Sequence, residues 1–376
     1  MKRLLQLTVL IGLTCLLLLP LAGCEDMPLL DAIMDAERDN PLDPESGVAM
    51  PDLGKVWRKL LVSMPLPTGM PMPVGRAFFA STTINGKIYV YGGGTDDMMA
   101  SFNDLIVFDG TNFEAIGLAD DSMNQISRGR YVSMVLVDGK PTMFGGRSNT
   151  NMLLNTITQY DLASQMFIYQ PVGIIPYLMT SAAVRLNDRY YLISGKRSSD
   201  GMGEEFSAFS YNSAAISPGT TAVAGPLDGL VGRMGHQAVR FYDSVVVIGG
   251  ERQDGKFDTG IYQSTNGVGF VKLGDVPADM GARRDFALVN VRLGDLDYLF
   301  LIGGRKAGGD GGNIGSTVMN DVWISRDGVN WTQQLAALPG AARLGMRAES
   351  LNGQIYLMGG LFANDTATAE VFTTAP

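Results

Sequence analysis

Hydrophobic runs that end in a glycine pair recur along the chain. Residues 88–91, 142–144, 246–248, 300–302 and 356–358 form such runs, which lead into Gly92-Gly93, Gly145-Gly146, Gly249-Gly250, Gly303-Gly304 and Gly359-Gly360. A sixth run, 191–193, leads into Ser194-Gly195. The pairs lie about 53 residues apart, which indicates six repeats of one supersecondary unit.

Each repeat predicts four short antiparallel strands. Each glycine pair follows the second strand of a predicted hairpin, with turns at Asn85-Gly86, Asp138-Gly139, Asn187-Asp188, Tyr242-Asp243 and Asn352-Gly353. A third strand is expected at 104–108, 156–160, 206–211, 260–263, 321–324 and 370–372, and a fourth begins at an aromatic residue such as Phe113, Phe167, Phe270 or Trp331. Four short strands per repeat of this length are typical of a β-propeller blade.

The last repeat ends after its third strand, and a segment near the start of the repeat region supplies a candidate fourth strand. Residues 56–62 resemble residues 330–335, with Trp57 in the place of Trp331. We therefore expect residues 56–62 to pair with the C-terminal repeat, close to Val371, and to close the ring, which removes its open edges.

The segment Asn320-Asp321-Val322-Trp323, followed eight residues later by Trp331, closely resembles a kelch repeat. The other units resemble the same pattern of an arginine, a hairpin, a glycine pair and a distant aromatic residue. The resemblance covers residues 56–376 and implies an all-β, six-bladed kelch-type β-propeller whose last blade is closed by an N-terminal strand.

The first 24 residues have the pattern of an export signal. Two basic residues precede an apolar run from Leu4 to about Leu19, and the segment ends Leu21-Ala22-Gly23-Cys24. This ending resembles the lipobox of bacterial lipoproteins, which implies a signal peptide at 1–23 and a lipid, such as palmitate, on Cys24. The alternative is an uncleaved membrane anchor. On the first interpretation the protein belongs to the bacterial cell envelope, on either the inner or the outer membrane.

Residues 24–55 predict an acidic tether between the lipid and the propeller. Nine acidic residues stand between positions 25 and 55 against Arg38 and Lys55, and the stretch 40–47 is rich in turn-forming residues. A solvated spacer is the simpler interpretation, and a docking peptide is the alternative.

The composition excludes several classes of function. The net charge is −9 and the pI about 4.7, which argues against nucleic-acid binding. One histidine and two cysteines, Cys15 and Cys24, both in the signal region, leave no ligand set for zinc or copper and argue against a copper radical oxidase. We expect no metal and no cofactor.

Arginine stands near the predicted start of the innermost strand in five of six units, and Leu178 takes its place in the other. These arginines are Arg76, Arg130, Arg233, Arg284 and Arg343. Further basic residues, Arg147, Lys196, Arg197, Arg252, Arg305 and Lys306, follow the glycine pairs, so positive charge is expected around one mouth of the channel. The arginines either bind the carboxylate of a ligand such as a sugar acid or bond to carbonyls and acids of neighbouring blades.

Two acids and the histidine are candidates for chemistry in the channel. Glu251 follows a glycine pair, and Glu349 lies inside the innermost strand of the last repeat, where an ion pair with Arg347 is expected if it faces the channel. His236 lies on the innermost strand of the fourth repeat, where packing is a simpler role than that of a general base.

Two functions are compatible with these features. The first is a membrane-anchored, exported propeller that acts as a non-catalytic binding or scaffold module for a protein or carbohydrate partner. The alternative is an enzyme, because exported kelch propellers include the sialic-acid mutarotase, which this chain resembles in fold, size and compartment. Such a sugar-acid isomerase needs an acid/base pair, for which Glu251 and Glu349 are the candidates, and a group such as Arg233 that holds the carboxylate.

Overall fold

The computed structural model describes residues 49–65, 75–95, 101–118, 129–148, 150–170, 175–200, 203–207, 209–214 and 223–375. The predicted signal peptide, Cys24 and most of the tether lie outside these residues. In the described part of the chain all regular structure is β-strand, paired in antiparallel sheets. None of the described residues forms a helix that could span a bilayer.

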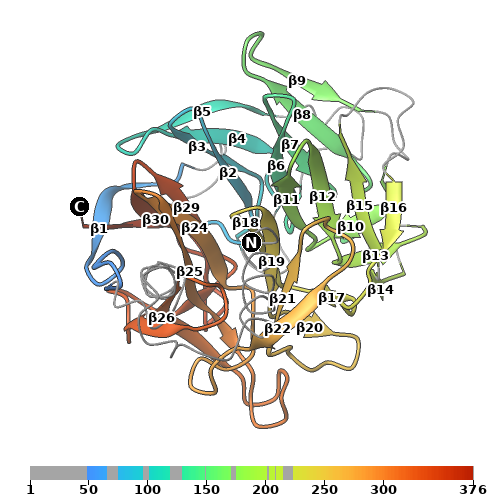
Figure 1. Ribbon diagram of the computed structural model, residues 1–376. Coiled ribbons are helices and arrows are strands. Elements are labelled where there is room, and N and C mark those ends of the chain that lie inside the picture. Colours follow the sequence, from blue (N-terminus) through green and yellow to red (C-terminus); the bar gives the residue numbers. More distant parts are fainter. Residues whose placement is uncertain are drawn as a thin grey trace, which may run out of the picture. The chain divides into compact units, whose positions relative to one another are not determined.

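Six larger sheets follow one another along the described chain, and each contains four strands in radial order (Figure 1); sheet 5 also includes the short strand β23, which pairs with β25. Sheet 1 contains β2 (Ala80–Ile84), β3 (Lys87–Tyr91), β4 (Asp104–Phe108) and β5 (Phe113–Leu118); sheet 2 contains β6 (Ser133–Val137), β7 (Lys140–Phe144), β8 (Ile157–Asp161) and β9 (Met166–Tyr169); sheet 3 contains β11 (Ala182–Leu186), β12 (Arg189–Ile193), β15 (Phe209–Ser213) and β16 (Val223–Pro226). Sheet 4 contains β18 (Gln237–Phe241), β19 (Ser244–Ile248), β21 (Gly260–Ser264) and β22 (Val271–Asp275); sheet 5 contains β24 (Ala287–Leu293), β25 (Leu296–Lys306), β26 (Thr317–Ser325) and β27 (Thr332–Leu335); sheet 6 contains β29 (Arg347–Leu351), β30 (Gln354–Met358), β32 (Glu370–Thr374) and β1 (Trp57–Ser63).

Sheet 6 is completed by the early strand, as the sequence predicts. Strand β1 pairs antiparallel with β32, and Trp57 stands opposite Thr374 while Lys59 stands opposite Phe372. The Nζ of Lys59 also donates to Glu370 on β32, at 2.6 Å. The two ends of the repeat region are thus joined in one sheet, which confirms the predicted closing strand.

The innermost strands contact one another in a closed circuit. Strand β2 contacts β6, and the contacts continue through β11, β18, β24 and β29 back to β2, the strands grouped around the middle of Figure 1. Hydrophobic clusters fill the spaces between consecutive sheets; Phe79 and Ile88 of the first unit, for example, pack with Tyr356 and Met358 of the last. Because each sheet carries apolar residues on both faces, it needs a neighbouring sheet on each side to bury them.

Glycine is needed in the recurring pairs because neighbouring backbone lies very close to them. Gly92 has a φ of 67°, and a Cβ there would lie 2.5 Å from the carbonyl oxygen of Gly129 in the next unit. Ser194 takes the corresponding place in the third unit with a φ of 56°, and its Oγ donates to the carbonyl of Ser207 at 2.9 Å.

Short strand pairs extend the sheets where the innermost strands begin. They are β10 (Tyr177–Met179) with β13 (Lys196–Ser198) and β14 (Glu205–Phe206), β17 (Arg233–Met234) with β20 (Glu251–Arg252), β23 (Arg283–Arg284) with β25, and β28 (Arg343–Leu344) with β31 (Leu361–Phe362). These pairs hold three of the five predicted arginines, Arg233, Arg284 and Arg343, whereas Arg130 forms an isolated bridge with Arg147.

Candidate functional site

Four arginines occupy the same position of the repeat, and each bonds to a backbone carbonyl and to an acidic side chain of the protein. Arg76, Arg233, Arg283 and Arg343 each lie two residues before a residue with positive φ, and each donates through Nη1 to the carbonyl of the first glycine of its unit's pair. Each also forms an ion pair with an acid at or near the start of the third strand, the partners being Asp104, Asp258, Asp321 and Glu370 in that order.

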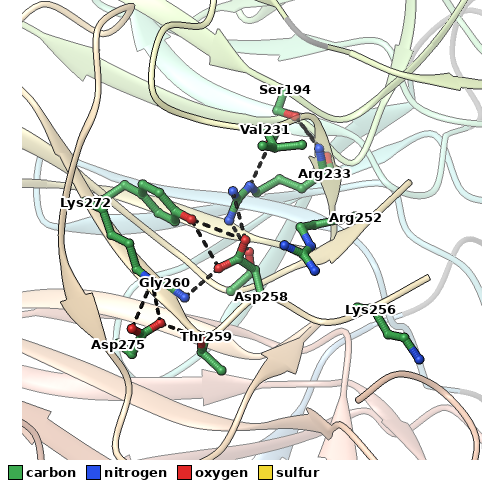
Figure 2. Close-up of polar contacts among 12 residues, drawn as sticks. Ser194, Val231, Arg233, Arg252, Lys256, Asp258, Thr259, Gly260, Lys272 and Asp275 are labelled. Atoms are coloured by element: carbon green, nitrogen blue, oxygen red, sulfur yellow. Dashed lines mark hydrogen bonds and ion pairs between the residues drawn. The ribbon is translucent and has the colours of Figure 1, made fainter. Parts of the chain in front are cut away.

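Figure 2 shows this arrangement around Arg233. Its Nη2 lies 3.3 Å from Asp258 Oδ2, and its Nε donates to the Val231 carbonyl at 3.0 Å. The guanidinium also lies 4.7 Å from the ring centroid of Tyr262. Its side chain is fully buried, so these contacts favour the structural alternative for this group of arginines. Ligand binding by Arg76, Arg233 and Arg343 stays a prediction that this geometry does not favour.

The repeated arginine of the fifth unit is Arg283 rather than the predicted Arg284. Arg283 forms the buried pair with Asp321, whereas Arg284, one position later, lies 3.4 Å from Glu251 and 3.3 Å from Asp285. Because Arg283 and Arg284 are adjacent, the sequence alone did not show which of the two occupies the repeated position.

Arg130 also stands one position later than the repeated arginine, and it is buried. Its Nη2 donates to Asn151 Oδ1 at 3.3 Å. The five predicted arginines therefore belong to two positions of the repeat, and none of them lines the central cavity.

Acids neutralise much of the positive charge expected at the channel mouth. Arg147 and Lys196 both contact Glu204, and Arg252 lies 3.0 Å from Asp254. Glu251 likewise bonds to Arg284 and does not line the central cavity. Its predicted catalytic role is untested, and its geometry is that of an ion pair.

A central cavity of about 420 Å³ is lined by all six innermost strands. The strands enter its wall through six residues with left-handed backbone, called here the left-handed ring: Phe78, Tyr131, Thr180, Gly235, Asp285 and Gly345. Backbone hydrogen bonds link neighbouring members; the amide of Phe78, for example, donates to the carbonyl of Gly345 at 2.7 Å.

Two glycines of the left-handed ring make room for side chains of the next unit around the circuit. A Cβ on Gly345 would lie 2.6 Å from the ring of Phe78, and a Cβ on Gly235 would lie 2.8 Å from Asp285 Oδ1. The rings of Phe78 and Tyr131 pack together at a tilt of 38°, with their centroids 4.4 Å apart. One side of this end of the cavity is therefore aromatic, and another carries a carboxylate.

At the second and fourth positions after the left-handed ring, one of the six innermost strands carries charged residues. The second and fourth residues after each ring residue are Ala80 and Thr82, Ser133 and Val135, Ala182 and Val184, Gln237 and Val239, Ala287 and Val289, and Arg347 and Glu349. Of these twelve described positions, only the two on β29 are charged. The sixth unit thus departs from the other five at the centre of the molecule.

Glu349 faces the first sheet from inside the cavity. Ser81 donates to its Oε1 at 2.7 Å and Thr83 to its Oε2 at 2.8 Å. Burial raises the pKa of the Glu349 carboxyl, while the two hydroxyl hydrogen bonds and the charge of Arg347 oppose that shift. A carboxyl whose pKa is raised is suited to donate or accept a proton near neutral pH.

Arg347 does not form the expected ion pair with Glu349. Its Nε donates to the carbonyl of Phe79 at 3.0 Å, and no described residue accepts a hydrogen bond from its two terminal nitrogens. Burial lowers the pKa of this guanidinium, and the charges of Glu349 and Asp285 counter the effect. The planar fork of Arg347 is thus available to a carboxylate in the cavity.

His236 lines the cavity but is buried. Its Nε2 lies 2.9 Å from the carbonyl oxygen of Ile193, and burial together with the charge of Arg233 lowers its pKa to about 3. The side chain is therefore neutral, which agrees with the packing role. Among the described residues no cluster of His, Cys, Asp or Glu could hold a metal ion.

Sequence reasoning missed Arg185, Arg240 and Gln237 as lining residues of the cavity. The sequence analysis named Arg347 only as the expected ion-pair partner of Glu349. A signal was present in the sequence: β29 carries charged residues at two positions where the other inner strands carry uncharged ones.

Comparisons with known proteins agree with this architecture. A solved structure titled "Structure of YjhT" shares 14% sequence identity with this chain at a TM-score of 0.63, and the similarity covers 80% of this chain and 94% of that chain. At this level of identity the likeness shows the fold alone. None of the curated proteins compared with the chain matches it.

The kelch β-propeller predicted from the repeats is confirmed by a family match. The KLHDC2/KLHL20/DRC7 Kelch-repeats domain matches residues 55–250, which is just over half of the chain. The chain therefore belongs to the Kelch-repeat family described by that domain.

Proposed function

We propose that this kelch propeller is a binding module for a small acidic carbohydrate, which enters the central cavity. The observation that carries the proposal is the guanidinium of Arg347, whose terminal nitrogens have no partner among the described residues inside a cavity of about 420 Å³. A cavity of that size is in the range of small-molecule sites.

The groups around Arg347 suit a sugar acid. The fork of Arg347 can hold a carboxylate through two parallel hydrogen bonds. Glu349 and the amide of Gln237 offer polar partners for hydroxyl groups, and the adjacent rings of Phe78 and Tyr131 offer an apolar surface for the face of a sugar ring.

The proposal also places the propeller in the bacterial cell envelope. The lipobox-like end at Cys24 supports a lipid anchor, and the acidic segment 24–55 supports a tether that holds the propeller away from the membrane. Metabolic labelling with a palmitate analogue tests the anchor, because the label should be lost on Cys24→Ala.

Isothermal titration with galacturonic acid tests ligand binding. We expect Arg347→Gln to weaken binding at least tenfold, because the charge that holds the carboxylate is lost. Arg58→Gln, on the exposed face of β1, is the matched control and should leave the affinity unchanged. Equal affinity of Arg347→Gln and the unmodified protein would contradict the proposal.

A second candidate function is isomerisation of the bound sugar acid at its anomeric centre. The observation that favours it is the raised pKa of Glu349, since opening and closing a sugar ring requires a proton donor and acceptor. Magnetisation exchange between the anomers, measured by NMR, should be faster with the protein than in buffer, and Glu349→Gln should remove the acceleration. An exchange rate equal to that in buffer would exclude this activity.

A further inference from the structure

A second pair of arginines lines the cavity farther from the left-handed ring. Arg185 and Arg240 stand at the fifth position after the ring residue on β11 and β18, which are neighbouring strands. The corresponding residues of the other four units are uncharged: Thr83, Leu136, Asn290 and Ser350. Positive charge is therefore concentrated on one side of this end of the cavity.

Both guanidiniums retain capacity to bind a ligand. Nη1 of Arg185 donates to the carbonyl of Leu136 at 3.2 Å, and the structure gives this side chain no ion pair with a described acid. Nε of Arg240 donates to the carbonyl of Tyr242 at 3.0 Å, and Nη2 lies 3.6 Å from Asp243. Both side chains of that ion pair are largely exposed, so solvent weakens the attraction. Neither arginine is held in a buried pair of the Arg283 type.

Arg185 and Arg347 lie at different depths and on opposite walls. Arg347 follows the left-handed ring by two residues and Arg185 by five, and three residues of an antiparallel strand span about 10 Å. Strands β29 and β11 are three steps apart in the circuit of six inner strands, which is the largest separation possible. The backbone positions of these two arginines therefore differ in depth by about 10 Å, and anionic groups held from opposite walls are matched better by two linked sugars than by one sugar ring.

We infer that the cavity takes an acidic disaccharide with a carboxylate on each sugar, rather than a monosaccharide. This inference rests on the proposed function. One carboxylate is held by Arg347, and the other is held by Arg185 with Arg240 at the rim. The wall between the two subsites is made of small and β-branched side chains such as Ala183, Val184 and Val239, which suit the apolar faces of the sugar rings.

Titration calorimetry with digalacturonic acid and galacturonic acid tests the inference on the full chain. We expect the dimer to bind at least tenfold more tightly than the monomer. Arg185→Gln should abolish that preference while leaving the affinity for the monomer unchanged, and Arg347→Gln should weaken the binding of both. Arg185→Lys, which keeps the charge, should keep part of the preference.

Arg292→Gln is the matched control, because Arg292 lies on β24 outside the cavity and is exposed. It should alter neither affinity. If the monomer binds through Arg347 but the dimer binds no more tightly, or if Arg185→Gln keeps the preference, the disaccharide inference is wrong and the proposed function stands. If neither sugar binds, both are wrong.

Discussion

Arg283 and Arg347 differ in how completely their hydrogen-bond donors are used. Arg283 donates five hydrogen bonds: two to the Met280 carbonyl, one to the Gly303 carbonyl and two to the carboxylate of Asp321. Arg347 donates one, to Phe79. The first arginine recurs in four units and joins strands, whereas the second occurs in one unit and keeps its fork for another partner. Repetition in this fold therefore indicates a structural role, and departure from the repeat indicates the site.

The largest expected effect is the loss of a repeated arginine. Arg283→Ala should lower the free energy of unfolding by about 3–5 kcal/mol, because it leaves the buried carboxylate of Asp321 without its counter-charge. Arg347→Gln should change it by about 1 kcal/mol or less, since a single hydrogen bond to a carbonyl is lost. Urea unfolding measures both. Similar losses for the two variants would remove the distinction between structural and site arginines.

The fold was more predictable than the site because the repeat encodes it several times. The glycine pairs report close backbone approaches, as Gly92 shows against Gly129, and the hairpin turns report positive φ, as at Asn85 and Gly86. Trp57 could be assigned to the last sheet because its segment repeats the pattern around Trp331. Each of these signals depends on local geometry that a short sequence specifies.

The site depends on which neighbour a side chain faces, and a single sequence does not encode that. Glu349 faces Ser81 and Thr83 of the next unit, whereas Arg185 reaches Leu136 of the unit before. Successive residues of a strand point in opposite directions. The one-residue ambiguity between Arg283 and Arg284 was therefore enough to exchange a fully buried pair for longer ion pairs that are partly exposed.

His236 differs from the buried arginines because burial keeps its side chain neutral. Its pKa of about 3 lies below the value of about 6.5 in an unfolded chain, so the unfolded state binds more protons between these values. Stability should therefore fall as the pH drops below about 6.5, by roughly 2 kcal/mol at pH 5 from this group alone.

His236→Gln, which can still donate to the Ile193 carbonyl, should lose less stability between pH 7 and pH 5 than the unmodified protein does. Thermal unfolding at several pH values measures this difference. The chain has one histidine, so its NMR signal is unambiguous. A titration midpoint near 6.5 would show that the imidazole is accessible and would contradict the packing role.

The ionisation of Glu349 should change stability with pH in the opposite direction to that of His236. Its raised pKa means that the folded state holds the proton more tightly than the unfolded state does, so stability should fall as the pH rises from about 4.5 through the folded pKa, and be constant above it. Glu349→Gln should remove this decline and flatten the curve in that range, which unfolding in urea at pH 4.5 to 7.5 can measure. Ser81→Ala, which removes a hydrogen bond that favours the charged form, should extend the decline to higher pH. Identical pH profiles for Glu349→Gln and the unmodified protein would show that this carboxyl titrates as in water.

The smallest expected effect belongs to Arg284, which stands beside Arg283 but is partly exposed. Its ion pairs with Glu251 and Asp285 are 3.4 and 3.3 Å long, and solvent screens them in part. Arg284→Ala should therefore lower the free energy of unfolding by about 1 kcal/mol or less, and added salt should reduce the difference from the unmodified protein. The same denaturation experiment compares it directly with Arg283→Ala. A loss from Arg284→Ala as large as that from Arg283→Ala would mean that position in the repeat does not decide the role of an arginine. A much smaller loss would show that one step along the strand separates an arginine that holds the strands together from one that contributes little to the free energy of unfolding.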